Sequence, residues 1–207
     1  MASAFAVGLG VGFLIAAGPG PIFFLVLRRN LARGWPSGLA TGLGVATADA
    51  IYAALAALGV AVITNVLIAQ RRWIGLAGGL AIALIGLRGI IAQSDPAPRP
   101  SRRGKGDVSH LGGDYLSVLA LTLSNPPTIL SFTAVFAGLG LQVSAGWTPA
   151  LGLVLGVMSG SALWWLFVTA IVALVRERLT PGVTRVIGVA SGLVLVLLGI
   201  AVGVRSL

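Results

Sequence analysis

The sequence predicts an all-α integral membrane protein with six transmembrane helices, arranged as an inverted 3+3 repeat. Of its 207 residues, 57% are hydrophobic and only 9% are charged, whereas a soluble domain carries about 25% charged residues. The mean hydropathy is +1.02. Apolar runs long enough for a helix to cross about 30 Å of hydrocarbon recur along the chain. The order of motifs in the first half also recurs in the second half.

Six apolar runs account for the predicted spans. Each contains almost no charge and is long enough, at the rise of an α-helix, to cross a bilayer. The second run contains a single acidic residue, and two of the runs contain prolines. The six predicted spans are Ala4–Leu27, Ser37–Ile63, Trp73–Ile91, Tyr115–Phe136, Ala150–Val175 and Val186–Val204.

The longest connection divides the chain into two repeats. Residues 92–114 are mostly Pro, Gly, Ser, Arg and Asp, a composition typical of a linker. We therefore predict a first three-helix repeat at residues 1–91 and a second at residues 115–207, joined by a basic cytoplasmic linker. No connection is long enough to hold a soluble domain.

Basic residues predict the orientation of the chain. With six spans, eleven of the fourteen Lys and Arg residues fall on the same side of the membrane. The positive-inside rule makes this side cytoplasmic, so both termini are expected outside the inner (plasma) membrane. The net charge of +9 then reflects topology and contact with the lipid bilayer, and no nucleic-acid partner is expected. The eleven residues are Arg28, Arg29, Arg33, Arg88, Arg99, Arg102, Arg103, Lys105, Arg176, Arg178 and Arg185.

The predicted repeat is visible in the sequence. A shift of 113 positions aligns residues 72–86 with residues 185–199, and eight of these fifteen positions are identical. Each half opens on a proline-interrupted span and continues with a span that contains a Gly-rich motif, which ends at Asp49 in the first half and at Ser161 in the second. Because three spans are an odd number, the second half must enter the membrane in the opposite direction.

The two proline clusters are candidate helix breaks. They are GPGP at residues 18–21 and NPP at residues 125–127. Proline removes a helical hydrogen-bond donor, and in inverted-repeat transporters such breaks expose backbone groups that hold a solute near the midplane. A half-helix beginning at Pro21 or Pro127 would direct its positive end toward an anion such as a carboxylate. The alternative is that these prolines only kink their helices.

Asp49 is the only acidic residue inside the long apolar runs. A carboxylate at the centre of a membrane helix costs roughly 2.5 to 3.5 kcal/mol, so its presence favours a role in transport. Its helical neighbours Gly42, Ala46 and Ala53 are small, so the carboxyl group should face protein and not lipid. A carboxyl group that binds and releases a proton during a conformational cycle would be a proton carrier. The alternative is an aspartate that is hydrogen-bonded for structure alone.

Other polar and small residues complete the predicted site. Trp164 and Trp165 lie deep in the fifth span, where we ascribe them to packing, with a role in the cavity wall as the alternative. Glycine pairs spaced four apart are predicted to pack helices, and they leave a homodimer open. The polar residues expected to share the cavity of Asp49, unless their side chains only cap the backbone, are Thr47, Tyr52, Ser124, Asn125, Ser131 and Ser161.

The residue inventory argues against an enzyme and against a metal site. The only histidine, His110, lies in the linker, so a serine protease lacks its base, and an aspartyl protease would need a second membrane acid. The chain has no cysteine, and one carboxylate is too few for a divalent cation, so we expect no cofactor. A channel and a structural scaffold are the alternatives to a transporter, but no polar ring predicts a filter and a scaffold leaves Asp49 unexplained.

Two stretches resemble a known family. Residues 19–60 contain a Pro-Gly-Pro element, a short basic loop and a Gly-rich helix with Asp49, and residues 123–140 contain an Asn-Pro element. Together they resemble the LysE/RhtB superfamily of amino-acid exporters, in length and spacing over nearly the whole chain. The resemblance implies a six-helix permease that exports amino acids or related small amines, driven by the proton gradient. It also implies functional roles for Pro19, Gly20, Pro21, Asp49, Asn125 and Pro126.

Two positions depart from the family pattern. Ile22 follows Pro-Gly-Pro where many members have Asn, and Pro127 follows Asn-Pro where many have Lys. Both changes remove a polar group from the predicted cavity. The resemblance therefore predicts transport without defining the substrate.

Overall fold

The protein is all-helical in a computed structural model that describes residues 1–18, 20–57, 70–94, 110–125, 128, 131, 132, 135, 147–176 and 180–205. This confirms the predicted all-α class for the described part of the chain. Its principal helices are α1 (Ala2–Ala16), α2 (Pro21–Arg33), α3 (Trp35–Ala57), α5 (Arg71–Ser94), α6 (Leu111–Leu123), α8 (Trp147–Arg176) and α9 (Pro181–Arg205).

Proline and glycine set several helix boundaries. α2 begins at Pro21 and α9 begins at Pro181. Proline suits the first turn because the amide there has no acceptor within the helix. α2 ends at Gly34, whose φ of 95° lies in the left-handed region that glycine adopts without strain. This single residue turns the chain from α2 into α3.

The first predicted span, Ala4–Leu27, is broken at GPGP as the prolines indicate. α1 stops at Ala16, α2 starts at Pro21, and the two helices meet at an angle of 78°. Gly20 precedes α2 with an extended backbone, φ −147° and ψ −177°. The interruption is therefore a sharp bend between two half-helices.

Three of the described helices are long and apolar enough to cross a membrane, and the bent α1–α2 pair makes a fourth candidate. The three lie in α3, α8 and α9. α5 and α6 correspond to two further predicted spans, but their described apolar stretches are shorter, at Gly75–Arg88 and Leu111–Leu123. The structure thus describes a protein with several apolar helices of membrane-spanning length.

Helices reach into both ends of the predicted linker. α5 continues to Ser94, and α6 already begins at Leu111, so residues 92–94 and 111–114 are helical. Asp114 is consequently a buried residue in the first turn of α6. Residues 95–109, with the basic cluster 99–105, lie outside the described residues.

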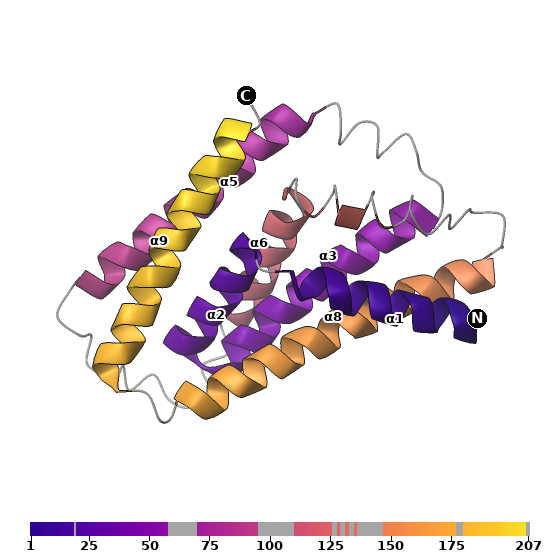
Figure 1. The fold of residues 1–207 in the computed structure, drawn as a ribbon, viewed down its shortest axis with the longest axis horizontal. Coiled ribbons are helices and arrows are strands. Elements are labelled where there is room, and N and C mark those ends of the chain that lie inside the picture. The colour runs from indigo at the N-terminus through magenta and orange to yellow at the C-terminus, as the bar shows by residue number, and fades with distance from the viewer. Residues whose placement is uncertain are drawn as a thin grey trace.

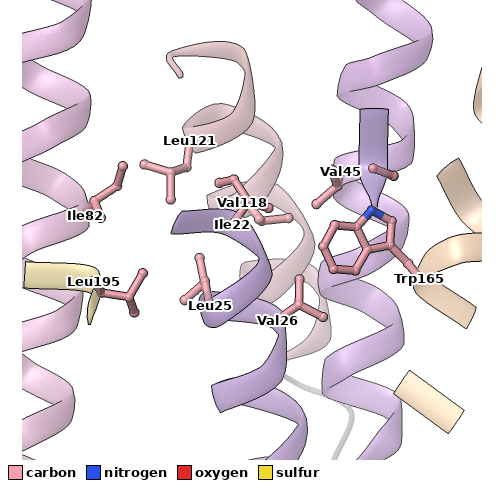
Figure 2. Packing of buried hydrophobic residues seen from close by; sticks show 10 residues of the cluster. Ile22, Leu25, Val26, Val45, Ile82, Val118, Leu121, Trp165 and Leu195 are labelled. Atoms are coloured by element: carbon pink, nitrogen blue, oxygen red, sulfur yellow. The ribbon is translucent and has the colours of Figure 1, made fainter. Parts of the chain in front are cut away.

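α2 and α6 lie at the middle of the molecule, as Figure 1 shows. The long α5–α9 pair lies on one side of them, and α1, α3 and α8 lie on the other. Side chains from six other helices meet around α2 in one apolar cluster, drawn in Figure 2. Leu25 of α2, Ile82 of α5 and Leu195 of α9 are almost fully buried there. This cluster joins the α5–α9 pair to the remaining helices.

Glycines allow α1 and α8 to approach closely. A Cβ atom on Gly8 would meet the carbonyl of Leu153, and one on Gly12 would meet the backbone of Val157. Gly156 and Gly160 of α8 face the α1 backbone in the same way. The packing role predicted for glycine pairs spaced four apart is confirmed for Gly8 and Gly12, whose face is occupied within one chain.

Candidate functional site

The two predicted helix breaks border one cavity of about 180 Å³. The first break contributes Gly18, Gly20 and Pro21, and the second contributes Asn125 with Thr122 and Thr128 on either side. α3 and α8 close the cavity between these breaks. The remaining lining residues are Ile15, Ala16, Ile22, Phe23, Val45, Asp49, Ser131 and Trp165.

The second break has the same origin as the first. α6 ends at Leu123, and Ser124 caps it, with its N–H directed to the carbonyls of Ala120 and Thr122. Residue 125 precedes a proline, and a residue in that position disfavours helical geometry. Pro126 and Pro127 lie outside the described residues, and so does Pro19 of the first break. The predicted roles of these prolines stay predictions.

Asp49 faces protein, as the small residues around it predict. Its side chain is on α3, is only 1% exposed, and lines the cavity. Ser161 of α8 is fully buried and donates a 2.7 Å hydrogen bond to Oδ2 of Asp49. Ala46 and Ala53 on the same face of α3 are also fully buried. The carboxyl group thus connects the two Gly-rich helices at the edge of the cavity.

Four of the predicted cavity residues lie outside its lining: Ser161, which contacts Asp49, and Thr47, Tyr52 and Ser124. The hydroxyl of Thr47 accepts a hydrogen bond from Tyr115, 2.8 Å away, and donates to the carbonyl of Leu43. Tyr52 donates to the carbonyl of Leu123 at 2.7 Å, and Ser124 caps α6. The bonds of Thr47 and Tyr52 connect α3 with α6, and Ser124 terminates α6. The structure therefore brings Gly20, Pro21, Asp49, Asn125 and Ser131 to the cavity, with Ser161 behind Asp49.

Thr122, Thr128 and Trp165 are polar lining residues that the sequence does not single out for the cavity. Thr122 precedes Asn125 by three positions, a spacing that can place two residues on one face near the end of α6. For Trp165, packing is the prediction and the cavity wall the alternative. It packs in the apolar cluster with 2% exposure, and it also lines the cavity.

Three buried polar atoms of the lining have no hydrogen-bond partner among the described contacts. They are Oγ1 of Thr122, Oδ1 of Asn125 and Nε1 of Trp165. These three residues are 1%, 4% and 2% exposed, and buried polar groups are almost always satisfied in folded proteins. The amide nitrogen of Asn125 donates to Thr128 at 2.8 Å, which leaves its oxygen as an acceptor. The cavity therefore offers donors and acceptors to a polar solute.

The described residues contain no group of three or more His, Cys, Asp or Glu side chains that could hold a metal ion. Within the lining, Asp49 is the single carboxylate. The chemistry of the cavity is that of a small polar site with one acidic group, an amide and hydroxyl groups.

Comparison with known proteins identifies the kind of protein that has this site. The chain is 28% identical over 166 residues to the threonine efflux protein of Escherichia coli (strain K12), covering 77% of each chain. It is 27% identical over 194 residues to the uncharacterized membrane protein YahN of the same strain, covering 90% of this chain and 86% of YahN. It is also 27% identical to the chemotactic transduction protein ChpE of Pseudomonas aeruginosa, covering 86% of both. No solved structure matches the chain.

The family comparison covers almost the whole chain and confirms the resemblance found in the sequence. The profile for LysE type translocators matches residues 13–206, which include both helix breaks, Asp49 and the α5–α9 pair. Translocators are membrane transporters and not enzymes. The apolar helices, the cavity and this match lead to one conclusion: the chain belongs to the LysE type translocator family.

Proposed function

We propose that the protein is a secondary-active transporter that exports amino acids or related small amines and couples their export to proton influx through Asp49. The observation that carries this proposal is the cavity of about 180 Å³ between two helix breaks, with a buried carboxyl group in its wall. Unwound backbone at the middle of a bilayer is tolerated where it lines such a cavity. The similarity to threonine efflux proteins supports an amino acid as the exported solute.

The size of the cavity fits a small solute. The cavity measures about 180 Å³. Pockets for drug-sized ligands start at about 300 Å³. A small amino acid or amine is therefore a better match than a large lipid or drug.

Asp49 is suited to proton coupling because it is the carboxylate of the lining and is shielded from water. An ionised carboxylate without water is costly unless a cation or a proton accompanies it. In the proposed cycle, the ammonium group of the solute and a proton take turns at this carboxylate. Release of one then favours binding of the other, which makes the two fluxes opposite in direction.

Alternating access in the proposed transporter rests on an inverted 3+3 repeat, and the contacts of α5 with α9 support it. The shift of 113 positions relates Gly79 to Gly192 and Gly86 to Gly199. A Cβ atom on Gly79 would meet the carbonyl of Gly199, and one on Gly86 would meet the carbonyl of Gly192. If the two halves are exchanged, the contact of Gly79 with Gly199 becomes the contact of Gly192 with Gly86. A two-fold axis between two antiparallel helices relates contacts in this way.

The core repeats this relationship. The same shift relates Ile82 of α5 to Leu195 of α9, and each is only 1% exposed. Figure 2 draws both side chains in the cluster around α2 and α6, Ile82 from α5 and Leu195 from α9. Equivalent positions of the two halves therefore have equivalent burial, which supports two repeats of opposite orientation.

The proposed topology has both termini outside and the basic connections in the cytoplasm. Three basic residues near the end of α2 make contacts that fit a fixed position at the inner surface. Arg28 donates to the carbonyl of Ile85 at 2.7 Å. Arg29 and Arg33 both pair with Asp114 at the start of α6. Pairing across the two proposed repeats would close the cytoplasmic side of the cavity in this conformation.

The test compares wild-type protein with Asp49→Asn in proteoliposomes that carry a pH gradient. We expect the wild type to accumulate labelled L-threonine or another small amino acid against its gradient, and Asp49→Asn to lose this accumulation at equal protein content. Asp49→Glu keeps a carboxyl group and should retain part of it. Accumulation by Asp49→Asn equal to wild type would rule out the coupling role, and flux that never exceeds equilibration would indicate a channel.

A further inference from the structure

Trp165 lines the cavity and its neighbour Trp164 does not. Both indole nitrogens are buried without a hydrogen-bond partner among the described residues. Trp164 packs against Phe13 and Phe167, with ring centroids 5.3 and 6.0 Å away. The ring of Trp165 lies 6.5 Å from the ring of Phe23, in the first turn of α2. Figure 2 shows this indole reaching from α8 toward α2, beside Val45 and Val26.

The first turn of α2 also lacks a cap. Gly20, which precedes the helix, has no side chain, and no side-chain cap bonds the first amides. Pro21 has no N–H, so Ile22 and Phe23 carry the first amides, and an amide in this turn has no intrahelical acceptor. Gly20, Pro21, Ile22 and Phe23 all line the cavity. The positive end of α2 is thus open to a solute beside the unpaired Trp165 N–H, which can only donate.

Acceptors lie on other walls of the same cavity. Oδ1 of Asn125 and Oγ1 of Thr122 have no partner within the described part of the chain, and the carboxylate of Asp49 adds negative charge. An ammonium group has three N–H donors and no acceptor. The donors contributed by α2 and α8 therefore suit a carboxylate, while these oxygens suit the ammonium group.

We propose that Trp165 is a carboxylate-binding residue, whose indole N–H joins the uncapped first turn of α2 in holding the carboxylate of the solute while its ammonium group points to Asp49 and Asn125. This proposal rests on the proposed transport function and extends it. The protein then selects α-amino acids over the corresponding amines, because an amine leaves the donors at α2 unpaired. A site built to hydrogen-bond one group of a substrate rejects analogues that lack it.

The experiment uses three full-length proteins in proteoliposomes: wild type, Trp165→Phe and the matched control Trp164→Phe. Both substitutions remove one unpaired indole N–H and keep an aromatic ring, but only the first changes the cavity. The probes are the standard amino acids, L-threonine first, and isopropanolamine, which is threonine without its carboxylate. Half-saturation concentration and maximum rate are measured separately.

We expect wild type to transport an amino acid and not its decarboxylated counterpart. Trp165→Phe should raise the half-saturation concentration about tenfold or more while the maximum rate changes little, since a hydrogen bond to a charged group is lost. Trp164→Phe should stay within about twofold of wild type, as expected for a residue away from the solute.

Three results would overturn the proposal while leaving transport intact. They are an unchanged half-saturation concentration in Trp165→Phe, an equal loss in Trp164→Phe, and wild-type transport of isopropanolamine as efficient as that of L-threonine. A wild-type protein that transports neither the amino acids nor isopropanolamine would instead refute the proposed function, and the carboxylate subsite with it.

Discussion

Ser161 donates a 2.7 Å hydrogen bond to Oδ2 of Asp49, and this bond joins the two Gly-rich helices, α3 and α8. Asp49 ends the motif of the Gly-rich helix in the first half, and Ser161 ends that of the second. Both side chains are almost completely buried. If the halves are related by a two-fold axis, that axis passes close to this pair, where an inverted-repeat transporter has its binding site.

Exchanging the two residues tests whether the carboxyl group can act from either of the two helices. Asp49→Ser alone should reduce gradient-driven export to background, because the carboxyl group is gone. Adding Ser161→Asp returns a carboxyl group to the same contact from the other helix, so the double variant should recover a measurable part of the export. Counterflow and pH-driven uptake in proteoliposomes measure this. Equal inactivity of the single and double variants would mean that the carboxyl group must lie on α3.

Asp114 should be important for stability although it was placed in a linker. It is 4% exposed and lies 3.6 Å from Nε of Arg29, and it also pairs with Arg33 and accepts from Ser37. Removing one partner of a buried ion pair typically costs about 3 to 5 kcal/mol because the other charge is left unpaired. Asp114→Asn should therefore lower the unfolding temperature in detergent by several degrees. Ser117→Ala, which removes one exposed contact of Arg29, serves as the control, and equal melting of both variants would contradict the assignment.

The α1–α8 contact should tolerate no side chain at Gly12. A Cβ atom there would meet the backbone of Val157, whereas one on Gly10, half a turn away on α1, would meet nothing within 4 Å. Overpacking typically costs about 1 to 3 kcal/mol, and more where backbone must move. We expect Gly12→Val to reduce the yield of folded protein in the membrane and Gly10→Val to leave it close to wild type. Size-exclusion profiles and thermal melting compare the two, and matching yields would refute the close contact.

The absence of cysteine allows the topology to be measured with single substitutions. Gln70 is exposed before α5, and Gly112 is exposed at the start of α6 with open space around it. In the proposed topology, a membrane-impermeant maleimide labels Gln70→Cys in intact cells and labels Gly112→Cys only after the membrane is opened. The opposite pattern would mean that the termini are in the cytoplasm.

Several properties of this protein follow from the sequence alone, because they depend on local chain physics. The hydropathy of the chain indicates helices in a membrane. An unpaired backbone group in lipid is costly, and an α-helix pairs its backbone groups within one segment. GPGP predicts the break between α1 and α2, because a proline has no N–H that could donate a helical hydrogen bond. The spacing of small residues around Asp49 predicts that its carboxyl group faces protein. All three properties are present in the structure.

The tertiary structure decided which side chains meet. Trp164 and Trp165 are adjacent in an apolar helix, and sequence cannot tell them apart, because which of the two faces the cavity depends on where α2 and α3 pack against α8. In the same way, Tyr52 and Thr47 look like cavity residues by their distance from Asp49 along the chain, yet packing of α3 against α6 directs them to Leu123 and Tyr115. The position of a residue in the sequence determines which face of a helix its side chain is on. Which neighbour that side chain contacts depends on packing between segments that are distant in the sequence.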